Sequence, residues 1–188
     1  RRALAFCRER NLVPVVLLGR SYTLHNDVLN SNVPTLLREQ GAIAIPLDCL
    51  PMDEGVPIFD EVFWGHSQRI LRAAWQIRRT PGLYSIFCSN YACGPDSFTV
   101  PFFAWLMEGR PYAVIETDGH SGDAGTKTRV EAFLHCVRED RLRAGQDDGR
   151  HEPRPAADLC VGTRTFQEVH REGERLLIPP MGPEAEAA

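Results

Sequence analysis

The sequence predicts an α/β domain of three layers, in which a mostly parallel sheet is covered by helices on both faces. Two observations lead to this prediction. Short apolar runs typical of buried strands alternate along the chain with segments of helical character. The 188 residues, 43% of them hydrophobic and 24% charged, are also sufficient for one core. In outline, the predicted fold is flavodoxin-like or Rossmann-like.

Four apolar runs are predicted to be buried strands. Each is rich in aliphatic or aromatic residues and lies beside a glycine or proline, which are typical of strand boundaries. In chain order they are residues 13–18, 42–47, 83–88 and 111–115. A fifth strand is predicted over residues 175–178.

Four other segments are predicted to be helices, over residues 34–40, 60–79, 98–107 and 127–142. Pro34 suits the first turn of the first helix, and Gly41 suits its end. The second and the fourth helix have apolar residues at helical spacing, and the third ends at Gly109.

The last part of the chain has a different character. Residues 143–174 contain much Gly, Asp, Arg and Pro without periodicity, which predicts a loop-rich insertion or connection. The predicted organisation is therefore an α/β core over residues 1–142, this connection, and residues 175–188 as the last strand and an exit toward a following domain.

Composition argues against two classes of partner. The formal net charge of −4 and the pI of about 5.9 provide no basic field for nucleic acid. No apolar run approaches the ~20 residues that a membrane span needs. The six cysteines are scattered rather than arranged as a disulfide framework, which favours a reducing cytoplasm. The first residues contain neither an initiating Met nor a secretory signal, so we expect a piece of a longer chain.

Cys93 is the leading candidate for function. It lies in a Gly/Pro turn, within SNYACGPDS at residues 89–97, between a predicted strand and a predicted helix. Backbone N–H groups and the helix dipole stabilise a thiolate at a helix N-terminus, which suits a metal ligand or a redox group. The alternative is an incidental buried thiol, which is the more common interpretation for the other five cysteines.

The loops after strands one, three and four are predicted to form one site, because ligands of open parallel sheets bind beyond the carboxyl ends of the strands. The first loop contains Arg20 and Tyr22, and the third contains Asp118 and His120. Arg20 either anchors an anion or pairs with Asp118. The loop with Asp118 and His120 either binds a metal or caps the next helix.

Several nucleotide and hydrolase motifs are absent from the sequence. We find no G-x-x-x-x-G-K-[ST] phosphate loop, no G-x-G-x-x-G after the first strand, and no G-x-S-x-G nucleophile elbow. The domain is therefore not expected to hold a nucleotide by itself or to be a hydrolase of that design.

Four segments resemble, in order, signatures of proteins related to the activase and dehydratase components of 2-hydroxyacyl-CoA dehydratases. The segment that begins GRSY at residue 19 resembles GRPYN…LN…IP. FWGHSQRIL at 63–71 resembles YWxYGQRIL, and NYACGPDSF at 90–98 resembles NFxCGPDSF. ETDGHSGDAGTKTRVEAF at 116–133 resembles EIDEHSADAGVxTRxEAF. Within this group the chain is similar to one excised domain of the multidomain proteins called acyl-CoA dehydratase activase-related.

The resemblance implies an iron–sulfur, ATP-dependent system that transfers electrons at low potential. Its cofactor would be a [4Fe–4S] or double-cubane cluster shared with other parts of the protein, with ATP on a separate module. The implied partners are an activase-like ATPase module and a cluster-binding module, in the same chain or as subunits. An acyl-CoA or another small molecule would be the substrate, and an oligomer is compatible with the resemblance. The enzyme class stays open between an iron–sulfur reductase and an acyl-CoA dehydratase, which is a lyase.

By position, Cys93 matches the cluster ligand of this family. Cys49 and Cys88 are further metal-ligand candidates, and the sheet order places Cys49 about 10 Å from strand three. Residues that would bind cluster sulfurs or anchor an anion are Arg20, Tyr22, Asn30, Asn90, Asp118, His120 and Arg129. No residue is assigned a catalytic role.

Two other interpretations stay open. One is a non-catalytic scaffold or docking domain of a multidomain activase-related protein, which the scarcity of ligands favours. The other is a flavin-binding domain of flavodoxin type, which is weaker because the first loop lacks a Ser/Thr-rich phosphate cradle.

Overall fold

The computed structural model describes residues 2–59, 62–90, 93–117 and 123–143. Its sheet consists of four parallel strands in the order β2-β1-β3-β4. The strands are β1 (Val13–Leu18), β2 (Ala42–Pro46), β3 (Tyr84–Asn90) and β4 (Tyr112–Thr117). All four predicted strands in this part of the chain are thus confirmed, while the predicted fifth strand lies outside the described residues.

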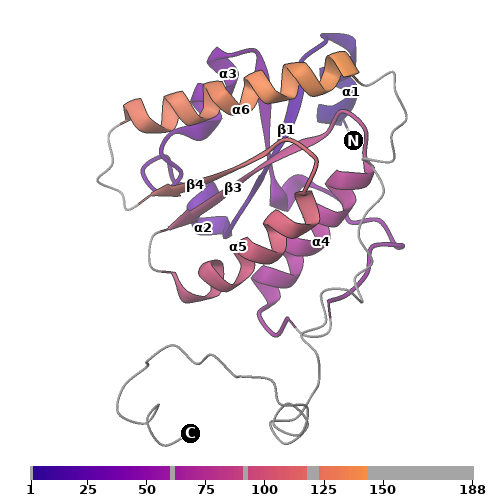
Figure 1. Cartoon of the computed structure of the whole chain (residues 1–188), viewed down its shortest axis with the longest axis vertical. Helices are drawn as coiled ribbons and strands as arrows, with labels where there is room; N and C mark the ends of the chain where they lie inside the picture. Colours follow the sequence, from indigo (N-terminus) through magenta and orange to yellow (C-terminus); the bar gives the residue numbers. More distant parts are fainter. Residues whose placement is uncertain (1, 60–61, 91–92, 118–122, 144–188) are drawn as a thin grey trace, which may run out of the picture.

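Helices cover both faces of this sheet. They are α1 (Arg2–Glu9), α2 (Ser21–Leu24), α3 (Val33–Glu39), α4 (Gly65–Arg79), α5 (Gly94–Met107) and α6 (Asp123–Arg143), with a short 3-10 helix, η1 (Leu47–Cys49). Figure 1 shows α1, α3 and α6 on one face and α4 and α5 on the other. The three-layer α/β/α fold is confirmed.

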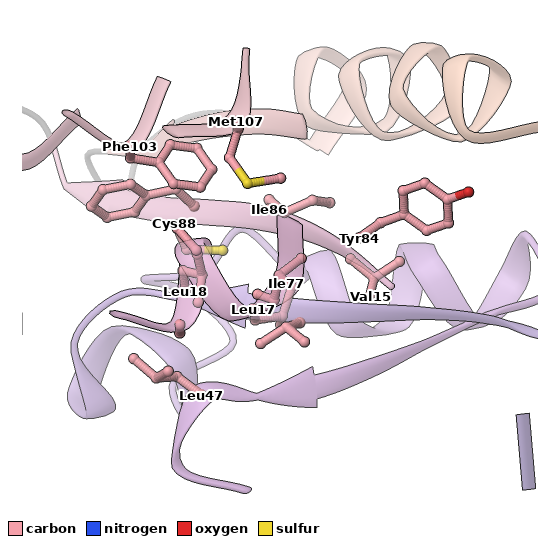
Figure 2. Packing of buried hydrophobic residues seen from close by; sticks show 14 of the residues in the cluster. Val15, Leu17, Leu18, Leu47, Ile77, Tyr84, Ile86, Cys88, Phe103 and Met107 are labelled. Carbon is pink, nitrogen blue, oxygen red and sulfur yellow. The ribbon is translucent and has the colours of Figure 1, made fainter. Parts of the chain in front are cut away.

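The core lies on the two central strands, β1 and β3. Phe103 of α5 is fully buried and packs edge-on against Phe87 of β3, with ring centroids 5.4 Å apart. On the opposite face, the Tyr84 hydroxyl donates a hydrogen bond of 3.0 Å to Asp140 of α6. Figure 2 shows how the buried side chains from strands and helices pack together. The central strands are buried because helices cover them from both sides.

Three helix starts differ from the prediction by several residues. The helix predicted over residues 60–79 begins at Gly65, and Phe63 is 88% exposed instead of lying on an apolar helix face. The Gln68 side chain explains this start, because it accepts a 3.2 Å hydrogen bond from the Phe59 N–H and donates one of 3.1 Å to the Val62 carbonyl. These bonds attach the backbone of Phe59 and Val62 to the side of α4 instead of continuing the helix.

The second difference concerns the helix predicted over residues 98–107, which begins at Gly94. Pro95 suits a first turn because its missing N–H would have no helical partner there, and Asp96 suits the positive end of the helix dipole. The helix predicted over 127–142 also starts earlier, at Asp123. Its predicted apolar face is confirmed, since Val130, Phe133, Leu134 and Val137 are all buried.

Among the residues that the structure describes, no helix combines the length and the apolar character that a membrane span requires.

Candidate functional site

The candidate site lies at the carboxyl ends of β1 and β3, which are neighbours in the sheet. Arg20 follows β1, and Cys93 is the N-cap residue of α5, with extended backbone angles of φ −78° and ψ 109°. The prediction that Cys93 stands at a helix N-terminus is confirmed. The Cys93 side chain is partly exposed, so a group from outside can reach it.

Gly19 is the residue that lets these two loops approach closely. It has a φ of 150°, and a Cβ atom at this position would lie 2.5 Å from the carbonyl oxygen of Cys88 on β3. Only glycine avoids both this contact and the conformational cost of a positive φ. The close approach of the two strand ends brings the next residue, Arg20, beside the α5 N-terminus.

Arg20 connects three groups of the site. Its Nη2 donates a hydrogen bond to the Cys93 Sγ and lies 3.2 Å from Asp96 Oδ1, and its Nη1 donates to the Tyr22 hydroxyl at 2.6 Å. Burial opposes the charge of Arg20, but the Tyr22 hydroxyl, Asp96 and Cys93 outweigh this effect and raise the Arg20 pKa. The guanidinium is therefore a permanent positive charge fixed beside the thiol.

Asp96 is a site residue that the sequence reasoning missed. It lies in the first turn of α5, its side chain is only 5% exposed, and its Oδ2 accepts a 3.2 Å hydrogen bond from the Ser89 hydroxyl. One of the two sequence-based predictions for Arg20 is a pair with Asp118. In the structure Arg20 pairs with Asp96, and Asp118 lies outside the described residues. The available signal was an acidic residue directly before the helix predicted over residues 98–107, where the helix dipole favours negative charge.

Asn90 and Asn30 hold the loops of this edge in place. The Asn90 Oδ1 accepts a 2.8 Å hydrogen bond from Thr23 Oγ1, while its Nδ2 donates weakly to the carbonyls of Leu29 and Thr117, at 3.5 and 3.4 Å. Asn30 is buried, and its Nδ2 donates to the Leu24 carbonyl at 3.0 Å. Both amides thus bond to the chain itself, which favours a structural role, while the buried Oδ1 of Asn30 has no partner among the described residues.

The two other metal-ligand candidates lie in different surroundings. Cys88 is fully buried in the core, and this burial raises its pKa to about 12, so its thiol is neutral (Figure 2). Its side chain points away from Asp96, because successive residues of a strand face opposite sides and the neighbouring Ser89 reaches Asp96. Cys49 is exposed on η1, after β2. Within the described ranges, no group of three or more His, Cys, Asp or Glu residues is placed to hold a metal ion.

Of the remaining cofactor-binding candidates, Arg129 is exposed on α6, and Asp118 and His120 lie outside the described residues. The structure therefore brings together Arg20, Tyr22 and Cys93 and adds Asp96 and Ser89 behind them.

A second polar cluster, also not predicted, lies beside this edge. Asp48 of η1 lies 2.7 Å from the Arg69 guanidinium and 3.2 Å from the His25 ring. Burial alone would raise the pKa of Asp48, but hydrogen bonds with Ser21 and His25 and the charge of Arg69 lower it. Asp48 is therefore an ionised carboxylate that connects the loops after β1 and β2 to α4.

Comparison of the chain with protein-family models, with curated proteins and with solved structures found no match.

Proposed function

We propose that this chain is a domain of an iron–sulfur, ATP-dependent, low-potential electron-transfer system related to the 2-hydroxyacyl-CoA dehydratases and their activases. In this proposal Cys93 contributes one thiolate to a [4Fe–4S] or double-cubane cluster. The observation that carries it is the partly exposed Cys93 thiol, held at the N-terminus of α5 by the Arg20 guanidinium. Cysteine thiolates are the usual ligands of iron–sulfur clusters.

Arg20 supports this role because it is a fixed hydrogen-bond donor to the sulfur. Hydrogen bonds to a ligating sulfur and nearby positive charge are two ways in which a protein tunes a cluster. Asp96 and Tyr22 hold the guanidinium from two other directions, so Arg20 stays oriented toward Cys93. Arg20 is therefore proposed as a positioning residue and Cys93 as the ligand.

The described residues supply only part of the ligand set that a cluster needs. A [4Fe–4S] cluster takes four cysteine ligands as a rule, whereas Cys93 is one thiolate at this edge. The remaining ligands would come from residues beyond the described part or from a cluster-binding module. ATP would bind a separate activase-like module. In this form the domain contributes to a shared redox centre in the reducing cytoplasm, where disulfides are rare.

A scaffold or docking domain is the second candidate function, and an aromatic surface favours it. Phe63 and Trp64 lie exposed at the start of α4, and Trp64 packs edge-on against Phe98 of α5 with ring centroids 5.2 Å apart. Exposed neighbouring aromatic residues are typical of surfaces that contact another protein. In this alternative the cluster and ATP bind elsewhere.

The test is the iron and acid-labile sulfide content of the full-length protein, purified without oxygen together with its cluster-binding module, with an EPR spectrum after reduction. Three forms are compared: the wild type, Cys93→Ser and Cys136→Ser. Cys136 is the matched control because its thiol is exposed on α6, on the other face of the sheet (Figure 1).

The proposal predicts a brown wild-type protein that bleaches in air. Cys93→Ser should lose most of its iron, sulfide and EPR signal, and Cys136→Ser should retain them. If a cluster protein kept the same iron content and EPR signal after Cys93→Ser, the ligand assignment would be wrong. A protein that is colourless with or without oxygen would favour the scaffold function.

A further inference from the structure

A hollow of about 400 Å³ lies between the loop that follows η1 and the first two turns of α4. Its walls are formed by Met52, Ile58, Gly65, Gln68, Arg69 and Arg72. The four α4 residues recur at helical spacing and so lie on one face of the helix. The proposed role of Cys93 makes no use of this hollow.

Two arginines give the hollow an excess of positive charge. Arg69 is paired with Asp48 at 2.7 Å, and Asp48 is shared with His25. Arg72 forms no ion pair within the described part of the chain. Of the charged side chains that line the hollow, Arg69 is therefore neutralised by Asp48, and the positive charge of Arg72 remains.

The guanidinium of Arg72 has hydrogen-bonding capacity that the described residues leave unused. Its Nε is buried and has no partner among them, and its Nη2 reaches only the Val56 carbonyl, at 3.5 Å. A buried donor without a partner is unfavourable, and the penalty is larger for a charged group. An oxyanion held by this guanidinium would remove the penalty, because Arg binds carboxylate and phosphate oxygens through its paired N–H groups.

The other walls suit an apolar group. Met52 and Ile58 contribute aliphatic surface, and Ile58 is 65% exposed although it is strongly hydrophobic. Gln68 ties the loop that carries Ile58 to α4, through hydrogen bonds to Phe59 and Val62. The hollow is thus largely preformed, and its size is within the range of sites for small organic molecules.

We propose that this hollow binds a small organic oxyanion, a carboxylate or a phosphate ester, whose charged group pairs with Arg72 and whose apolar chain lies on Met52 and Ile58. The inference is independent of the cluster proposal. It uses none of the residues around Cys93, and its test requires neither iron nor ATP.

Four probe molecules distinguish the contribution of charge to binding from the contribution of apolar contact. Octanoate and octyl phosphate carry both features, inorganic phosphate carries only the charge, and 1-octanol carries only the chain. Binding is measured by calorimetry and by ¹H–¹⁵N spectra of the arginine Nε–H groups. The signal of Arg72 is assigned from its loss in Arg72→Lys, which retains the charge but lacks the Nε–H. The variants for affinity are Arg72→Gln and the control Arg38→Gln, an equal charge change on the exposed surface of α3.

The expected result is that at least one of the two chain-bearing anions binds and shifts the Arg72 Nε–H signal. Its affinity should fall at least tenfold in Arg72→Gln and stay unchanged in Arg38→Gln. Phosphate and 1-octanol should bind at least tenfold more weakly. The tighter of the two anions identifies the ligand as a carboxylate or a phosphate ester.

Three results would overturn the proposal. One is octanol binding as tightly as octanoate. Another is the absence of any shift at the Arg72 Nε–H in the wild-type protein, a measurement that does not depend on a variant folding. The third result concerns two acidic residues, Asp60 and Glu61, which come directly after Ile58 and Phe59 in the sequence. If Asp60→Asn with Glu61→Gln moved the Arg72 signal while no probe did, a carboxylate of the chain itself would be the anion.

Discussion

Replacing Gly19 by alanine is expected to destabilise the domain severely, although the change adds only one methyl group. The new Cβ would lie 2.5 Å from the Cys88 carbonyl oxygen. This oxygen belongs to the backbone of β3, in the middle of the sheet, so no side-chain rotation relieves the contact. The residue would also have to keep a φ of 150°, a conformation that residues with a side chain rarely adopt.

The size of the effect follows from the strained backbone conformation and from the steric contact. A backbone conformation of this kind costs about 1–3 kcal/mol. Forcing extra atoms into a packed region costs another 1–3 kcal/mol, roughly, because neighbouring backbone must shift. Their sum of about 2–6 kcal/mol is a large part of a free energy of unfolding that is typically about 5–15 kcal/mol. For a domain of this size it corresponds to a fall in Tm of at least roughly 4 °C, and of roughly 8–16 °C at the middle of that range.

Urea denaturation followed by circular dichroism measures the effect, with Gly125→Ala as the control. Gly125 lies within α6, and a Cβ there would meet nothing within 4 Å. Since alanine favours a helix over glycine, Gly125→Ala should stabilise the protein, by up to about 1 kcal/mol. An unchanged urea midpoint for Gly19→Ala would refute the reasoning, as would an equal loss of stability in both variants.

Three further predictions concern the site and the core. Arg20→Gln leaves the buried Asp96 without its cation and should lower the free energy of unfolding by about 2–4 kcal/mol; adding Asp96→Asn should restore part of the loss in a double-mutant cycle. Phe103→Ala should cost about 3–5 kcal/mol by urea denaturation, whereas Phe63→Ala, at an 88% exposed residue, should change stability by less than about 0.5 kcal/mol. Burial raises the pKa of Cys88 from 9.0 to about 12. Between these two values the unfolded chain loses the Cys88 proton while the folded protein keeps it. The free energy of unfolding therefore falls as the pH rises from about 9 to 12. The urea midpoint should therefore fall less steeply above pH 9 in Cys88→Ala than in the wild type, and equal slopes would contradict this cause.

Much of the fold was predictable because its signals are local. The apolar strands, and glycines such as Gly41 and Gly109 beside the helix ends, depend on the residues of each segment alone. The face of α6 that packs on the sheet was readable from spacing. Helix starts were less predictable: α4 begins late because the Gln68 side chain binds the backbone of residues 59 and 62, a contact that apolar periodicity does not reveal.

The candidate site was predictable only in part. The turn with glycine and proline after a strand placed Cys93 at a helix N-terminus, which the structure confirms. The Arg20–Asp96 pair was not predicted, because it depends on how closely the ends of β1 and β3 approach, and the alternative partner Asp118 lies outside the described residues. Cys88 and Cys93 are five residues apart, yet one lies in the core and the other at the edge.

By itself, the sequence determined the fold class, the strands and the position of the thiol at a helix start, since each follows from neighbouring residues. Only the tertiary structure decided which charges meet. The Arg20–Asp96 pair joins residues that are distant in the chain, and so do the Asp48–Arg69 pair and the hollow beside Arg72. Such contacts depend on the strand order and on the packing of helices against the sheet, which no local pattern specifies.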